Sequence, residues 1–131
     1  WIHGDLHLGN LMRRTEDSPW CDYAGGPIAV LLDFAEMRTG HWVEDAVYLE
    51  RQHWGAPPEV TKGIKPVSML ARARRNLMLE VNDEDHRLAD LKRAISAAVA
   101  PALLHVEGNA DYFNGALRVL EQSAERLLGA P

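Results

Sequence analysis

The sequence has few of the features that mark secreted, membrane or nucleic-acid-binding proteins. Cys21 is the only cysteine, so an internal disulfide framework is impossible and a reducing compartment is expected. No apolar run approaches the roughly 20 residues of a membrane helix, and the start lacks a signal-peptide pattern. The formal net charge of -5 comes from scattered residues, without an acidic or basic tail. We therefore expect a cytoplasmic chain with neither a nucleic-acid partner nor a membrane partner.

Length and composition favour one folded domain. The chain has 131 residues, of which 47% are hydrophobic, and this is enough to bury a core. It begins at Trp1, directly beside its most polar and glycine-bearing loop, although chain ends usually fray. We expect residues 1–131 to be a piece of a larger protein.

The first third of the sequence predicts a loop followed by a β-hairpin. Residues 3–10 contain two glycines and no helical periodicity, and residues 10–14 can form a short strand. Turn-forming residues then fill positions 15–27, which predicts a surface connection. The apolar run 28–32 predicts a buried strand that ends at Asp33. Pairing of the two strands would bring Asn10 close to Asp33.

The rest of the sequence predicts about four helices, so the expected fold class is α+β and mostly helical. The first covers residues 43 to about 54, and a second region over 59–81 is divided by Gly63 and Pro66. A third helix starts at Asn82-Asp83 and is kinked or ended at Pro101; a fourth follows the break at 107–109. The positions expected to face the core are Val43, Ala46, Val47, Val67, Leu70, Ala71, Leu77, Met78, Val81, Leu88, Leu91, Ile95, Val99, Phe113, Leu117, Leu120, Ala124 and Leu127.

Four polar residues lie where core packing does not require them: His3, Asp5 and Asn10 in the loop, and Asp33 at the strand end. Phosphoryl transfer needs a carboxylate that orients or accepts the proton of the attacking hydroxyl, and oxygen ligands that hold magnesium. Magnesium prefers carboxylate, amide and water oxygens. The residue types therefore indicate chemistry on a metal-bound nucleotide.

The segments His3-Gly-Asp5-Leu-His-Leu-Gly-Asn10 and Leu32-Asp33-Phe34, with Gly40 and Asp45 after them, resemble the aminoglycoside phosphotransferase and choline kinase group of the protein-kinase-like fold. The resemblance implies that Asp5 is the catalytic base or hydroxyl-positioning residue, with His3 as the loop brace beside it. It also implies that Asn10 and Asp33 bind magnesium and, through it, ATP. The residues implied to support the site structurally are Gly4, Gly9, Gly40 and Asp45.

The same resemblance implies an ATP- and Mg²⁺-dependent enzyme that phosphorylates a hydroxyl of an aminoglycoside-, choline- or sugar-like molecule. Residues 1–36 would form the catalytic loop and metal-binding hairpin, and residues 37–131 a helical subdomain. The lobe that grips ATP with a glycine-rich loop and a strand lysine has no counterpart here, because Lys62, Lys65 and Lys92 lie after the motif. The isolated chain is therefore expected to be inactive. Leu8, Ala35 and His41 depart from the patterns of related kinases.

Two alternatives remain open. The chain could be a non-catalytic helical domain with an incomplete kinase-like site. It could also be a metal-dependent phosphoesterase, because Gly4-Asp5-Leu6-His7 resembles a fragment of the calcineurin-like metallophosphoesterases, although that chemistry needs further His and Asp ligands. The sequence assigns no firm role to His7, Glu36, Glu44 or Cys21, and Arg72, Arg74 and Arg75 are interpreted as a solvated helix face.

Overall fold

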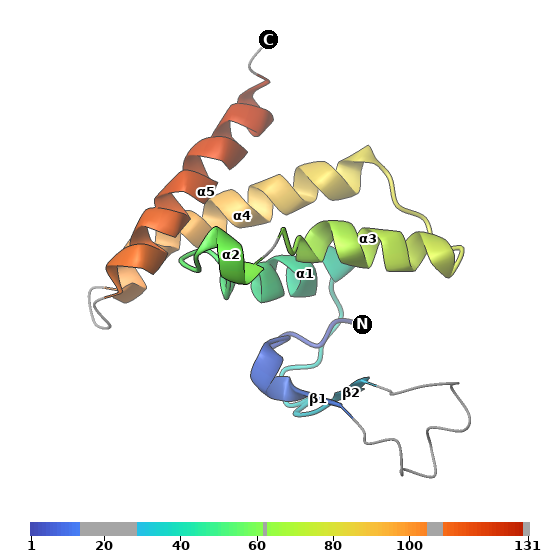
Figure 1. Cartoon of the computed structure of the whole chain (residues 1–131). Coiled ribbons are helices and arrows are strands. Elements are labelled where there is room, and N and C mark those ends of the chain that lie inside the picture. Colours follow the sequence, from blue (N-terminus) through green and yellow to red (C-terminus); the bar gives the residue numbers. More distant parts are fainter. Residues whose placement is uncertain (14–28, 62, 105–108, 130–131) are drawn as a thin grey trace.

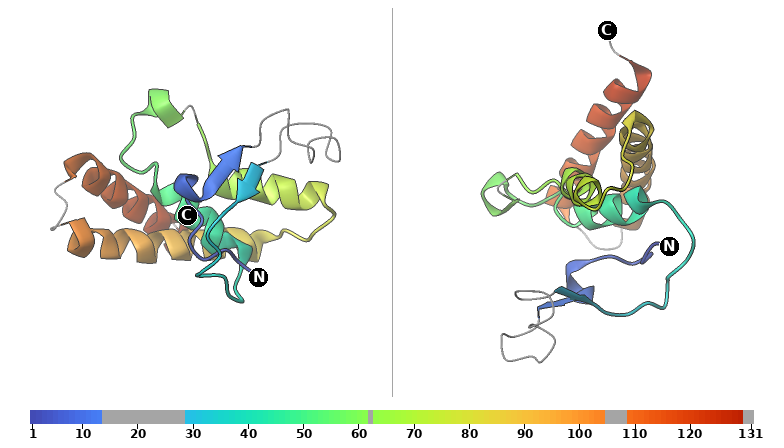
Figure 2. Two further views of the ribbon diagram at one scale, coloured as in Figure 1. Left: turned by 90° about the horizontal axis from the view of Figure 1, so that it is seen from below. Right: turned by 90° about the vertical axis from the view of Figure 1, so that its right-hand side faces the viewer.

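The structure, a computed structural model, describes residues 1–13, 29–61, 63–104 and 109–129. A loop and a two-stranded hairpin lie on one side of a group of helices (Figures 1 and 2). This agrees with the expected α+β, mostly helical fold class. The predicted turn at 15–27, with Cys21, lies outside the described residues, as do Lys62 and residues 107–108 of the predicted break.

The predicted hairpin is present. The 3-10 turn η1 (Leu8–Asn10) leads into β1 (Leu11–Arg13), which pairs antiparallel with β2 (Ala29–Leu31). Leu11 faces Leu31 in the ladder, so Asn10 and Leu32 continue the pairing at the strand ends. The prediction that the second strand is buried was wrong: Leu31 and Leu32 are 39% and 37% exposed. A two-stranded ribbon can bury one of its faces only by packing against another element. Here β1 and β2 make most of their contacts with each other rather than with a helix.

In the part of the chain that the structure describes, four longer helices and one short helix follow the hairpin. Their bounds are α1 (Trp42–Arg51), α2 (Pro58–Thr61), α3 (Pro66–Asn76), α4 (Asp83–Leu104) and α5 (Ala110–Leu128). Helices α1 and α5 start at recognisable caps: His41 and Glu44 form a capping box on α1, and the Asn109 side chain accepts from the Tyr112 amide on α5. Within the described residues, no helix is long and apolar enough to span a membrane.

The core consists of two clusters joined by α4. The first cluster is buried between α1, α3 and α4; its members are Val43, Ala46, Val47, Val67 and Ala89. The second lies where α4 meets α5 and the chain after α1; its members are Trp54, Ala97, Ala100 and Ala116. The predicted core stripe of α1 is confirmed by Val43, Ala46 and Val47. That of α5 is confirmed only in part, because Leu120 packs against the second cluster while Leu117 is exposed.

Several predicted core positions were wrong. Helix α3 ends at Asn76, before Leu77 and Met78, which are 71% and 93% exposed. On α4 the large side chains of Leu91, Ile95 and Val99 are 45%, 53% and 49% exposed. The buried face of α4 carries alanines instead: Ala89 packs against α1 and α3, and Ala97 and Ala100 lie where α4 meets α5, which small side chains let approach closely. Pro101 does not end the helix, which continues to Leu104.

Candidate functional site

The loop that carries the motif is fastened to the start of α1 by Asp45. Its two carboxylate oxygens accept hydrogen bonds from the backbone amides of His3 (2.7 Å) and Gly4 (2.9 Å). These bonds satisfy two loop amides and fix the residue just before Asp5 relative to the helix. A further backbone bridge joins Ile2 to Arg38 on the approach to α1.

The His3 side chain lies on the buried side of the loop, where it contacts the end of the hairpin. Its side chain is 5% exposed, and its Nε2 donates to the carbonyl oxygen of Leu32 at 2.8 Å. The imidazole also packs against Phe34, with ring centroids 5.0 Å apart. Because Leu32 directly precedes Asp33, His3 holds the strand end in place relative to the loop. These are the contacts of a brace.

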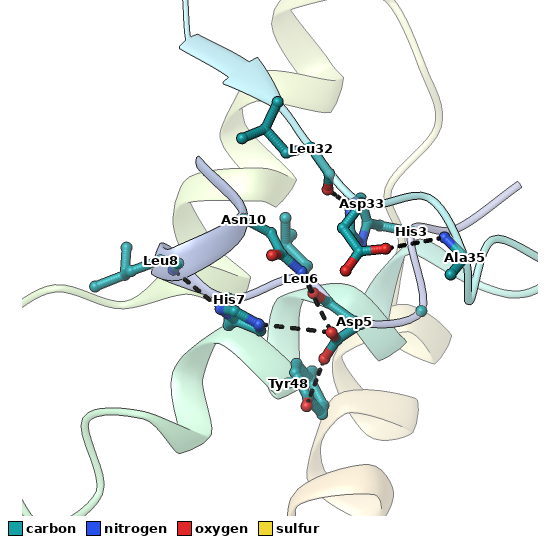
Figure 3. Close-up of polar contacts among 12 residues, drawn as sticks. His3, Asp5, Leu6, His7, Leu8, Asn10, Leu32, Asp33, Ala35 and Tyr48 are labelled. Atoms are coloured by element: carbon teal, nitrogen blue, oxygen red, sulfur yellow. Dashed lines mark hydrogen bonds and ion pairs between the residues drawn. The ribbon is translucent and has the colours of Figure 1, made fainter. Parts of the chain in front are cut away.

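Asp5 receives hydrogen bonds from two different elements (Figure 3). The Tyr48 hydroxyl on α1 donates to Oδ1 at 2.7 Å, and the Asn10 amide donates to Oδ2 at 3.2 Å. The bond from Tyr48 is the main reason that the pKa of Asp5 lies below its usual value of 3.8, although desolvation opposes it. Asp5 is therefore a carboxylate at neutral pH, with the oxygen positions set from both sides.

Asn10 and Asp33 lie at adjacent ends of the two strands. The Leu32 amide donates to the Asn10 carbonyl at 2.9 Å, which places Asp33 one residue beyond the ladder. The Asn10 side-chain amide nitrogen also donates to the Asp5 carbonyl at 3.0 Å, so its oxygen, Oδ1, is the atom left for a cation. Asp33 is exposed and has a φ of 57°, a left-handed conformation that Asp tolerates better than most residues.

An amide oxygen and a carboxylate fit what magnesium takes from a protein, which is one or two oxygen ligands with water completing the shell. Asn10 and Asp33 are therefore the described residues that could hold this ion. Among the described residues, no group of three or more His, Cys, Asp and Glu could hold a metal ion. The described part of the chain thus offers the phosphoesterase alternative no further His and Asp ligands.

His7 and Gln52 complete the attachment of the loop. His7 Nδ1 accepts from the Gly9 amide at 2.9 Å, so the ring proton is on Nε2, which lies 3.5 Å from Asp5 Oδ2. Gln52, which follows the last turn of α1, accepts from the Leu8 amide at 3.1 Å. His7, which the sequence left open, is thus a third group in contact with the Asp5 carboxylate.

The sequence reasoning missed Tyr48 and Gln52, although a signal was present. Asp45, Tyr48 and Gln52 are spaced three and four residues apart, which puts them on one face of a helix. That face is polar, whereas the buried residues Val43, Ala46 and Val47 define the opposite stripe. A polar stripe that begins at the motif aspartate indicates the face that meets the loop.

The glycines of the motif lie at points of close backbone approach. Gly4 has a φ of 85°, and a Cβ there would collide with the carbonyl oxygen of Glu36. A Cβ on Gly9 would come within 2.8 Å of the His7 ring, and one on Gly40 within 2.6 Å of Ile2. Glu36 therefore meets the loop through its backbone carbonyl, and its side chain is exposed.

The remaining charged candidates have structural contacts. Glu44 caps α1 through the His41 amide at 3.2 Å and pairs with Lys92 at 3.3 Å. Arg74 lies 5.4 Å from the centre of the Trp42 ring. Arg72 and Arg75 are exposed, as expected for a solvated helix face.

A cavity of about 380 Å³ opens beside residues that contact Asp5. Its lining residues come from the loop, from α1 and its C-terminal end, and from α5: His7, Tyr48, Arg51, Gln52 and Tyr112. Two of them, His7 and Tyr48, contact the Asp5 carboxylate directly. A molecule in this cavity could thus reach the residues that position Asp5.

Comparison with known proteins gives one positive result. Residues 1–73, more than half of the 131-residue chain, match the family model described as the phosphotransferase enzyme family (APH). The matched segment contains the loop, the hairpin, α1 and α2, and thus His7, Asn10 and Tyr48, the three side chains described above as contacting the Asp5 carboxylate. No curated protein and no solved structure matches the chain. The chain belongs to the phosphotransferase enzyme family.

Proposed function

We propose that this chain is the C-terminal lobe of an ATP- and Mg²⁺-dependent phosphotransferase that phosphorylates a hydroxyl of a small molecule. Residues 1–36 would form the catalytic loop and metal-binding hairpin, and residues 37–131 the helical subdomain. The observation that carries the proposal is the position of the Asp5 carboxylate. It is held between Tyr48 on α1 and Asn10 on the loop, and Asn10 adjoins the strand end that bears Asp33.

In this proposal, Asp5 orients the acceptor hydroxyl and receives its proton. The acceptor oxygen forms a bond to the γ-phosphorus while the bond to the ADP oxygen breaks, so the products are the phosphate ester and ADP. Asn10 and Asp33 would hold the magnesium ion, which offsets the charge of the phosphate oxygens when ATP is bound. The low pKa of Asp5 fits a group that acts as the proton moves in the transition state rather than before it.

The nucleotide itself needs further residues. In kinase-like folds a glycine-rich loop and a strand lysine cover the phosphates. The only strands in the described residues are β1 and β2, which are three residues each, and Lys65 and Lys92 belong to the helical part that follows them. We therefore propose that a nucleotide lobe elsewhere in the intact enzyme supplies those groups.

The test is Asp5→Asn in the intact enzyme that contains this chain. The substitution keeps the shape of the side chain but removes the charge that accepts the proton. Turnover should fall by about 10²- to 10⁴-fold, the usual contribution of general acid–base catalysis. The measurement is ATP-dependent ADP release in the presence of a hydroxyl acceptor.

Asp111→Asn is the matched control, because Asp111 is an exposed aspartate in the first turn of α5. It should keep wild-type turnover. Turnover of Asp5→Asn within twofold of wild type would contradict the proposed role of Asp5. ADP release that does not depend on any added acceptor would contradict phosphoryl transfer to a small molecule.

A further inference from the structure

Arg51 is a half-buried cation close to Asp5 with no ion pair among the described residues. It lies in the last turn of α1, and its guanidinium carbon is 5.3 Å from the centre of the Tyr48 ring. Tyr48 in turn donates to Asp5. A guanidinium that is partly removed from water gains from a hydrogen-bonded anion, because the anion replaces the lost hydration.

The acidic residues near Arg51 are already engaged. Asp45 uses both of its oxygens for backbone amides of the loop. Glu44 pairs with Arg38 at 3.1 Å and with Lys92 at 3.3 Å, although all three line a smaller cavity that Arg51 also borders. The other cations of that region are thus neutralised, whereas Arg51 is not.

Glu50, the residue before Arg51, is engaged as well. Its two oxygens accept from Arg93 at 2.7 and 2.8 Å, and Asp90 contacts the same guanidinium at 2.8 Å. This network belongs to the contact between α1 and α4. It leaves no carboxylate of α1 for Arg51.

The cavity of about 380 Å³ beside His7 and Tyr48 shows the same lack of a negative partner for Arg51. Arg51 and His7 bring positive or protonatable groups to it, and Tyr48, Gln52 and Tyr112 bring hydroxyl, amide and aromatic surface. None of the described lining residues is acidic. A polycationic molecule would therefore meet a fixed positive charge there, whereas an anion would meet a donor suited to bind it.

The cavity adjoins two residues that contact the Asp5 carboxylate, His7 and Tyr48. In Figure 3, Tyr48 projects toward Asp5 from the side opposite to Asp33. Tyr48 bonds to Oδ1, whereas Asn10 and His7 contact Oδ2, so among the cavity-lining residues Tyr48 is the one that meets the carboxylate oxygen away from the proposed metal ligand. Phosphoryl transfer is close to in line, so the acceptor lies on the side of the transferred group away from the leaving ADP.

We infer that the acceptor carries an anionic group, such as a carboxylate, which Arg51 binds while the neighbouring hydroxyl is held at Asp5. This inference deepens the proposed phosphotransferase function and rests on it. Among the acceptors that the family resemblance implies, it favours an acidic sugar-like molecule over an aminoglycoside or choline. Tyr48 and Tyr112 provide ring surface for the apolar face of such a sugar.

Three hexoses of matched size test the charge preference: glucuronate, glucose and glucosamine. Their dissociation constants for the intact enzyme are measured by ligand-observed NMR, with Arg51→Gln, Arg51→Lys and the exposed Arg72→Gln as variants. Glucuronate should bind about tenfold more tightly than glucosamine, the usual effect of one hydrogen bond to a charged group. Arg51→Gln should abolish this difference, whereas Arg51→Lys should keep most of it and Arg72→Gln all of it.

Equal or tighter binding of glucosamine, no binding of glucuronate, or an unchanged preference in Arg51→Gln would each overturn the inference. The anion that Arg51 meets could also be a phosphate of ATP. In that case Arg51→Gln would raise the KM for ATP and leave glucuronate binding unchanged, which also counts against the inference. Failure of the proposed function gives a separate result, namely wild-type turnover in Asp5→Asn.

Discussion

At the scale of single residues, the position of the Asp5 carboxylate is fixed by two hydrogen-bond donors, one close in the sequence and one distant. Asn10 is five positions away on the same loop, whereas Tyr48 is 43 positions away on α1. A carboxylate with donors on both oxygens has little freedom to rotate. This matters for catalysis because small errors in the position of a reacting group cost large factors in rate.

Tyr48→Phe should lower kcat of the intact enzyme by about tenfold, since it removes one hydrogen bond to a charged group. The bond from Tyr48 lowers the pKa of Asp5, so its loss should raise that pKa. The acidic limb of the pH–kcat profile should consequently move to higher pH. Steady-state kinetics over a pH series measure both effects.

Unfolding in urea is the control for Tyr48→Phe, because a general loss of structure would also lower kcat. The free energy of unfolding should change by no more than about 1 kcal/mol, the usual net worth of a hydrogen bond. An acidic limb that stays in place while kcat falls would contradict the pKa argument. It would leave Tyr48 with a packing role only.

Residues of the site could be predicted from the sequence to the extent that their relations are local. Asp5, Asn10 and the glycines fall within ten positions, and Asp33 follows a recognisable strand. The contact of His7 with Asp5 depends on the 3-10 turn that His7 caps, which has no clear sequence signature. Arg51 could not be identified, because its lack of an ion pair depends on the partners chosen by Glu44 and Glu50.

At the scale of elements, α1 packs into the core with one face and binds the motif loop with another. Val43, Ala46 and Val47 pack into the core, while Asp45 and Tyr48 bond to the loop. The capping box of His41 and Glu44 fixes where this helix begins. A shift of α1 by one residue would therefore move the loop contacts and the core contacts together.

Glu44→Gln should destabilise the protein by about 0.5–1 kcal/mol near neutral pH, a typical value for a partly exposed ion pair. Burial opposes the charge of Glu44, but the His41 amide, Lys92 and Arg38 outweigh burial and hold its pKa below the usual 4.5. A carboxyl group whose pKa is lowered by folding stabilises the protein at pH values above its pKa in the unfolded state. This stability is lost as the pH falls through the pKa of the folded state.

The difference in unfolding free energy between wild type and Glu44→Gln should therefore shrink as the pH falls below 4.5. Urea unfolding at several pH values measures it. Glu121→Gln, at an exposed position of α5, is the control and should show no such pH dependence. A difference that grows on acidification would reverse the sign of the argument.

Element positions were predicted well, but the buried face of α4 was not. Two stripes run along this helix at helical spacing, and the sequence favoured the one with Leu91, Ile95 and Val99 because its side chains are larger. The structure buries Ala89, Ala97 and Ala100 instead. Side-chain hydrophobicity favours burial of the first stripe. Close packing favours the second, because Ala89 lies against α1 and α3 and Ala97 and Ala100 lie against α5, and the sequence of α4 alone does not identify these partners.

At the scale of the whole molecule, the core and the site use different parts of the chain. The two hydrophobic clusters are built from helices and from Trp54, and the loop and hairpin contribute no residue to either. The loop is attached through hydrogen bonds to α1, and its Ile2 and Leu6 side chains are also buried. The two clusters can therefore form without the loop and hairpin, whereas the proposed nucleotide binding would need groups beyond the helices.

The 131-residue chain alone should consequently unfold cooperatively and show no measurable rise in Tm when MgATP is added. Ligand binding stabilises a fold in proportion to the logarithm of ligand concentration over Kd, so MgATP should have no effect if, as proposed, a second lobe supplies the nucleotide contacts. Thermal unfolding with and without MgATP is the measurement, and Asp33→Asn is the control. If MgATP raises the Tm of the chain and Asp33→Asn abolishes that rise, the hairpin itself grips the nucleotide, and the proposal of a second lobe for ATP is wrong.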